Sequence, residues 1–105
     1  MCEEQPDRAI ALSAACLKVN PESIAAKINH AAALINSELF GSADLILREI
    51  DESSLTRAAL NQLRFIKLKR AVKIGDEGET RRLAALIDKS VLYSVQLRWL
   101  AENRI

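Results

Sequence analysis

Few residues in this sequence could do acid, base, nucleophilic or metal chemistry. The chain has one histidine, His30, and two cysteines, Cys2 and Cys16. Two cysteines at this spacing fit neither a disulfide framework nor a zinc site, and one histidine completes no set of metal ligands. We therefore expect reduced thiols, no metal and no other cofactor. We interpret His30 as a partly buried packing residue of a helix rather than as a base.

The sequence motifs that mark enzymes do not occur in the chain. It has none of the G-x-S-x-G, H-E-x-x-H or Walker patterns. The segment 75–78 (GDEG) lacks the alternating oxygen ligands of an EF-hand calcium loop, so we interpret it as a plain turn. The sequence therefore predicts a protein that binds a partner, and not an enzyme.

The charges are divided between the two halves of the chain. The net charge is +1, but residues 1–53 carry four Lys or Arg against nine Asp or Glu, and residues 54–105 carry eleven against five. A basic run in the second half contains Lys67, Lys69, Arg70 and Lys73. We interpret this run as a solvated helix face, and the alternatives are an acidic partner or phosphate groups. Since aromatic residues do not alternate with these cations, nucleic-acid binding is a minor alternative.

Length and composition indicate one small all-α domain over residues 1–105. Half of the 105 residues are apolar, sixteen are alanine, and three glycines and two prolines are too few for the turns of an all-β protein. So short a chain cannot hide every apolar group in one core, and we expect some of this surface to meet a partner. The acidic start MCEEQPDR is unlike a secretory signal, and no apolar run could cross a membrane. We therefore expect a cytoplasmic protein without membrane insertion.

Apolar spacing and breaks in the pattern predict six helices, over 7–19, 21–36, 43–50, 55–74, 79–89 and 91–102. Pro21 suits the first turn of the second helix, Ser42 is a candidate cap for the third, and Gly75 suits the left-handed residue that ends the fourth. Because every link is short, consecutive helices are expected to pack antiparallel as hairpins.

A shift of 34 residues aligns several positions of the chain with one another. Ala9 then matches Ala43, where a small residue lets two helices approach, and Phe40 and Pro21 take the aromatic and closing-proline positions of a tetratricopeptide repeat. Lys27 replaces the tryptophan usual in that repeat. The pattern predicts three antiparallel hairpins in a tetratricopeptide-like superhelix, and the alternative is an ordinary alanine-rich bundle.

Four segments carry a resemblance to a known family: 8–17 (RAIALSAACL), the block from Asn29 through Phe40 to Asp44, the long helix over 55–74, and 80–86 (TRRLAAL). With these segments the chain resembles the tetratricopeptide-like chaperones of type III secretion needle subunits. The resemblance implies a cytoplasmic protein whose groove sequesters the C-terminal amphipathic helix of a needle subunit. It also implies a small helical co-chaperone as a further partner in some cases.

In the repeat frame, two of the predicted helices line the concave face. Its residues are Ala25, Ile28, Ala32 and Ile35 on one helix, and Ala59, Gln62, Ile66 and Lys69 on the other. This mainly apolar stripe fits a helix packed in a groove rather than a peptide carboxylate, and the alternative is that Ile28 and Ile66 belong to the core. Trp99 either completes the core or anchors a partner.

With the function that the resemblance implies, we expect a chaperone that covers the assembly surface of a secretion subunit and so prevents premature polymerisation. The first alternative is a general tetratricopeptide module for protein interactions. The second and weaker alternative is a small helical nucleic-acid-binding protein that uses the basic run.

Overall fold

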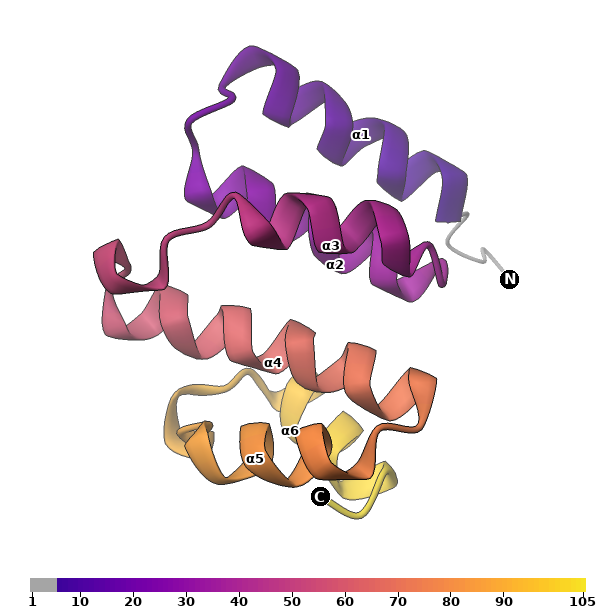
Figure 1. The fold of residues 1–105 in the computed structure, drawn as a ribbon, viewed down its shortest axis with the longest axis vertical. Helices are drawn as coiled ribbons and strands as arrows, with labels where there is room; N and C mark the ends of the chain where they lie inside the picture. The colour runs from indigo at the N-terminus through magenta and orange to yellow at the C-terminus, as the bar shows by residue number, and fades with distance from the viewer. Residues whose placement is uncertain (1–5) are drawn as a thin grey trace. The chain divides into compact units, whose positions relative to one another are not determined.

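The computed structural model describes residues 6–105, and their regular structure is entirely helical (Figure 1). Six α-helices and two short 3-10 helices follow one another along the chain, and this described part contains no strand. They are α1 (Pro6–Val19), α2 (Ile24–Asn36), α3 (Phe40–Arg48), η1 (Glu52–Ser54), α4 (Arg57–Ile74), α5 (Glu77–Leu86), η2 (Lys89–Val91) and α6 (Ser94–Glu102). Over residues 6–105, the prediction of an all-α fold with six helices is confirmed.

The chain divides into two compact units, one ending at Leu55 and the other spanning Thr56–Ile105. In the N-terminal unit, α2 packs against both α1 and α3. A hydrogen bond also joins α1 to α2, because Ser13 Oγ lies 2.8 Å from His30 Nδ1. The apolar side chains buried on α2 and α3 are those of Ile28, Ala31, Leu34, Ile35, Ala43 and Leu47.

In the C-terminal unit, α5 packs along α4 and the segment from η2 to α6 completes the core. The rings of Phe65 and Trp99 meet edge to face, with their centroids 5.5 Å apart. This arrangement is favourable for the quadrupoles of two aromatic rings. The buried core residues are Phe65, Leu68, Leu83, Ile87, Leu92 and Leu100.

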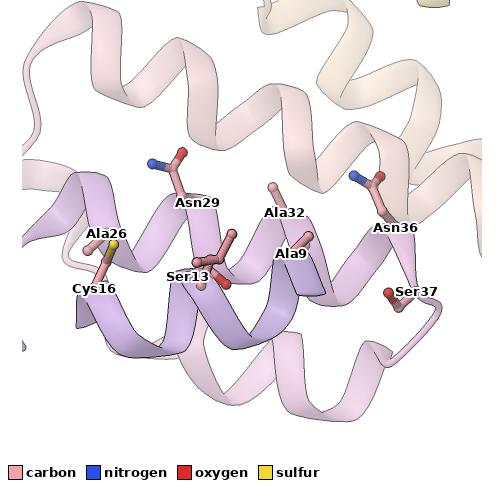
Figure 2. Close-up of a pocket in the computed structure, with 10 residues that line it drawn as sticks. Ala9, Ser13, Cys16, Ala26, Asn29, Ala32, Asn36 and Ser37 are labelled. Carbon is pink, nitrogen blue, oxygen red and sulfur yellow. The ribbon is translucent and has the colours of Figure 1, made fainter. Parts of the chain in front are cut away.

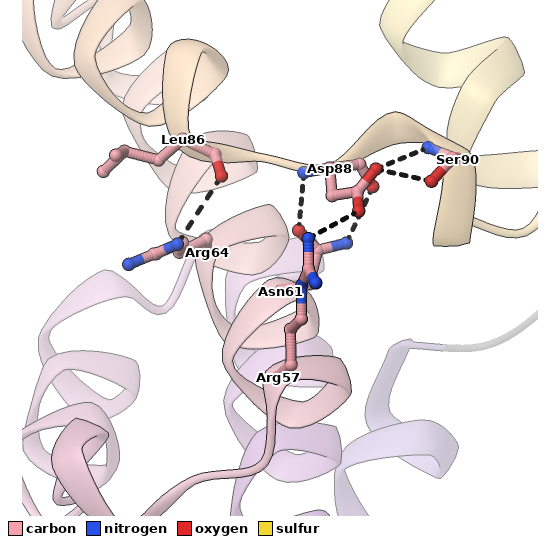
Figure 3. Close-up of polar contacts among 6 residues, drawn as sticks. All are labelled: Arg57, Asn61, Arg64, Leu86, Asp88 and Ser90. Carbon is pink, nitrogen blue, oxygen red and sulfur yellow. Dashed lines mark hydrogen bonds and ion pairs between the residues drawn. The ribbon is translucent and has the colours of Figure 1, made fainter.

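Buried Asn61 of α4 fixes the turn that follows α5 (Figure 3). Its Nδ2 donates to the carbonyl oxygen of Asp88 at 3.1 Å, and its Oδ1 accepts from the N–H of Asp88 at 2.8 Å. Nearby, the guanidinium of Arg57 lies 3.5 Å from the carboxylate of Asp88, and that of Arg64 donates to the carbonyl oxygen of Leu86 at 3.5 Å.

The local structure of one unit recurs in the other at a spacing of 37 residues. Asp51 precedes η1 and accepts from the N–H of Ser53 at 3.0 Å, just as Asp88 precedes η2 and accepts from the N–H of Ser90 at 3.0 Å. The residues just after α2 and α4 repeat in the same way: Glu38 has φ 61° and Gly75 has φ 78°. The observed spacing between equivalent residues is therefore 37, whereas the sequence alignment predicted 34.

Several helix ends differ from the predicted ones for local reasons. The second helix begins only at Ile24, since Ser23 caps it by accepting from the N–H of Ala26 at 3.1 Å. The third begins three residues early, at Phe40, because Glu38 adopts the left-handed conformation and turns the chain at once. The last two helices are each shorter than predicted, as η2 lies between them.

The predicted C-terminal ends of α1, α2, α4 and α6 match the structure. Gly75 is the left-handed C-cap of α4, and Thr56 caps the start of that helix by accepting from the N–H of Ala59 at 3.1 Å. The division into two units does not establish three hairpins. The hairpin arrangement therefore stays a prediction.

Candidate functional site

A groove of about 520 Å³ lies between α1 and α2 in the N-terminal unit (Figure 2). Its walls carry mainly small or apolar side chains, which leave space between the two helices. They are Ala9, Leu12, Ser13 and Cys16 of α1, and Ala26, Asn29, Ala32, Ala33, Asn36 and Ser37 of α2 and its C-cap. The groove can therefore receive apolar side chains of a ligand.

Polar groups also line this groove. Asn29 and Asn36 are seven residues apart, which places both exposed amides on one side of α2. The hydroxyl oxygen of Ser37 is buried and has no hydrogen-bond partner among the described residues. The two amides offer hydrogen bonds to the polar edge of a ligand that fills the apolar floor.

Ser13 and His30 form a hydrogen-bonded pair whose serine lines the groove. A serine and a histidine at 2.8 Å are within reach of nucleophile and base chemistry. However, Ser13 Oγ also donates to the carbonyl oxygen of Ile10 at 3.0 Å, and a hydroxyl has one proton. Because the Ser13 hydroxyl donates its proton to the carbonyl oxygen of Ile10, it can only accept from His30 Nδ1. The pair therefore links α1 to α2 and leaves the histidine no free pair of electrons on Nδ1 to act as a base toward Ser13.

The four predicted binding residues of α2 do not all line the groove. Ala32 is one of the groove residues, whereas Ala25 is exposed elsewhere on the helix. Ile28 and Ile35 are buried, with 8% and 1% of their surfaces exposed. That burial accords with the core alternative for Ile28.

In the C-terminal unit, α6 engages part of the predicted stripe of α4. Gln62 and Gln96 exchange side-chain hydrogen bonds, the shorter one from Gln96 Nε2 to Gln62 Oε1 at 2.7 Å. The ammonium of Lys69 lies 5.7 Å from the centre of the Trp99 ring, a cation–π contact. Gln62 and Lys69 of α4 thus contact Gln96 and Trp99 of α6, respectively. Ile66 is buried and Ala59 is partly buried.

Partial burial changes the chemistry of the basic run. Desolvation lowers the pKa of Lys69, and the nearby charge of Lys73 lowers it further. Lys67, Lys69 and Arg70 are all partly buried, and only Lys73 of the run is exposed. The run is therefore less solvated than the sequence predicted.

The remaining candidate chemistry is sparse within residues 6–105. Cys16 is an exposed free thiol at the groove, while Cys2 lies outside the described residues. The described residues contain no cluster of three metal-binding side chains. Among the helices of this part of the chain, none combines the length and apolarity needed to span a membrane.

The groove residues that sequence reasoning missed include Ser13, Asn29 and Asn36. The two asparagines were missed because α2 carries alanines on several sides, so hydrophobic spacing could not select one face of that helix. A better signal was available in the two asparagines, since their spacing of two helical turns sets one polar edge.

Comparison of the chain with protein-family models, curated proteins and solved structures finds no match.

Proposed function

We propose that this protein is a cytoplasmic chaperone that sequesters an amphipathic helix of a type III secretion needle subunit. The observation that supports this proposal most directly is the groove of about 520 Å³ between α1 and α2. The partner class in this proposal is the one that the sequence resemblance to such chaperones implies. The finer architecture, three hairpins in a tetratricopeptide-like superhelix, is part of the same proposal.

The apolar face of the partner helix would occupy the space that alanines leave open. Ala26, Ala32 and Ala33 form the α2 wall, and Leu12 contributes an apolar side chain, 59% exposed, from α1. Burial of apolar surface stabilises such a complex by about 25 cal/mol per Å² before the costs of association are subtracted. Filling the groove would also shield Leu12 from water.

The polar edge of the groove would set the orientation of the bound helix. Asn29 and Asn36 present amide groups that can donate to or accept from polar side chains of the partner. Such contacts favour one register of the helix over another.

The mechanism requires binding without turnover. A needle subunit polymerises through its apolar helix faces, so covering one of these faces removes the subunit from filament growth. The same complex must release its cargo for export, which limits the useful affinity. A catalytic group is therefore unnecessary for this function.

The proposal is tested by co-expression of the chain with a type III secretion needle subunit from the same genome. We expect the subunit to stay soluble and to elute with the chain as one complex in size-exclusion chromatography. Polymerisation of the subunit to the same extent with and without the chain would overturn the proposal. Stable binding of an unrelated helical protein instead would favour a general interaction module.

A further inference from the structure

An exposed apolar strip lies at the start of α6, in the C-terminal unit. It consists of Val91, Tyr93 and Leu97, whose surfaces are 53%, 70% and 40% exposed. Leu92 has extended backbone angles, φ −83° and ψ 150°, so the side chains before and after it point away from this buried residue. Tyr93 and Leu97 are four residues apart and therefore adjacent along the helix. We call these three residues the α6 strip.

Two of these three residues have more polar equivalents just before α4, whereas Leu97 corresponds to Leu60. At the 37-residue spacing, Val91 corresponds to Ser54 and Tyr93 to Thr56. Thr56 caps α4 with its hydroxyl, whereas the side chain of Tyr93 makes no such bond to α6. Replacing a threonine cap weakens a helix. At the start of α6 the capping contact comes instead from Gln96, whose Oε1 accepts from the N–H of Tyr93 at 2.9 Å, while the Tyr93 ring is exposed.

Positive charges flank the α6 strip. Lys89 and Arg98 are exposed on either side of it along the chain, whereas the exposed guanidinium of Arg57 near η2 is paired with the carboxylate of Asp88. Residues 56–105 carry eleven Lys or Arg against five Asp or Glu. A partner with carboxylates beside its apolar contact residues is therefore electrostatically complementary to this surface.

A second copy of the chain fits the α6 strip poorly. A symmetric dimer formed by two such strips would bring Lys89 and Arg98 close to their own copies, and like charges at an interface cost affinity. A contact between the α6 strip and the acidic N-terminal half of another copy would be head to tail. Such contacts can add one copy after another without forming a closed oligomer. A separate acidic partner avoids both difficulties.

We propose that the α6 strip docks an acidic amphipathic helix of a partner protein. Tyr93 provides the central contact, since tyrosine offers a large apolar surface with few rotatable bonds and is common at binding hot spots. The apolar face of the partner covers the strip, and its glutamates or aspartates lie beside Lys89 and Arg98. This surface lies in a different unit from the groove between α1 and α2, so the two proposals are tested independently.

The probe for this surface is a fluorescent amphipathic peptide of about 20 residues, long enough to form an isolated helix. It carries leucines along one face and glutamates beside them, and its matched control has lysines in place of the glutamates. In anisotropy titrations at low salt, we expect the glutamate peptide to bind at least about ten times more tightly than the lysine peptide. Equal affinities would overturn the proposal.

The variant Tyr93→Thr separates docking from folding because it places the capping residue of α4 at the start of α6. We expect it to lose at least about ten-fold in affinity for the glutamate peptide. Its thermal midpoint should rise by about 4 °C through the new cap. The control Leu45→Thr changes an exposed side chain of α3 and should keep the affinity. Unchanged affinity in Tyr93→Thr contradicts the proposal.

Sedimentation velocity of the protein without peptide completes the test. We expect one species whose sedimentation coefficient is the same in wild type and Tyr93→Thr. Self-association of the wild type that disappears in Tyr93→Thr would assign the strip to a second copy and overturn the proposed partner.

Discussion

Asn61 and Asp88 are joined by two hydrogen bonds across 27 positions of sequence: the amide of Asn61 donates to the backbone carbonyl of Asp88 and accepts from its backbone N–H. One side chain thereby replaces both of the hydrogen bonds that a neighbouring backbone could supply to this residue. Asn61 is 4% exposed, so water cannot take over its role. The contact fixes where η2 begins relative to α4.

Replacing the Asn61 amide should lower the stability of the protein. We expect Asn61→Ala to lower the free energy of unfolding by about 2–3 kcal/mol, since it removes two hydrogen bonds and leaves the backbone of Asp88 without those partners. Urea denaturation followed by circular dichroism measures the change. The control Arg57→Ala removes an ion pair whose arginine side chain is 91% exposed, and it should change stability by less than about 0.5 kcal/mol. Equal effects of the two substitutions would contradict this account of the turn.

The left-handed residues Glu38 and Gly75, which follow α2 and α4, should respond to substitution with opposite signs. Glu38 has φ 61°, which is unfavourable for a residue with a side chain, so Glu38→Gly should stabilise the protein by up to about 1 kcal/mol. Gly75 has φ 78° and open space where a Cβ would stand, so Gly75→Ala should destabilise the protein by about 1 kcal/mol through the backbone alone. Thermal unfolding of both variants tests this. The same sign of change in both would be inconsistent with equivalent helix ends.

The carboxylates before the two 3-10 helices should titrate below the usual range. The hydroxyl of Ser90 donates to Asp88 and lowers its pKa from the ordinary value of 3.8, and the N–H of Ser90 lowers it further. Ser53 acts in the same way on Asp51. Because the folded pKa is the lower one, this contribution to stability is present above about pH 4 and is lost as the pH falls through the folded pKa.

Ser90→Ala tests the cause of this shift. Without the hydroxyl, the pKa of Asp88 should move up toward its ordinary value, while the pKa of Asp51 stays low. Carbon NMR titration of the side-chain carboxyls measures both groups in one sample. An unchanged titration of Asp88 would mean that the hydroxyl of Ser90 is not the main cause.

Local chemistry explains which parts of the fold could be predicted from the sequence. Gly75 marks the end of α4 because glycine tolerates positive φ, and Ala-rich and Leu-rich spacing indicates helices. The start of α3 was harder, since Glu38 takes the left-handed conformation that glycine takes in the other unit. The pairs Asp51 with Ser53 and Asp88 with Ser90 repeat in sequence, and they are the signal of the 37-residue spacing.

The candidate site was less predictable than the helices. Alanines point in several directions from α2, so apolar spacing alone could not tell the groove side from the core side. Ile28 and Ile35 fit a lining stripe by spacing, but the structure buries both. On α4, the side chain of Gln62 pairs with Gln96, a contact between helices that no local pattern contains.

The central claim is that the groove between α1 and α2 binds the amphipathic helix of a needle subunit. Isothermal titration of a peptide spanning that C-terminal helix into wild type, Leu12→Asp and Leu45→Asp tests it most directly. Leu12 lines the groove and Leu45 does not, yet their exposed fractions are 59% and 61%, so the two substitutions should perturb folding equally. We predict binding by wild type and Leu45→Asp and a loss of at least about ten-fold in affinity for Leu12→Asp. Equal affinity of all three proteins, or no binding by wild type, would contradict the claim.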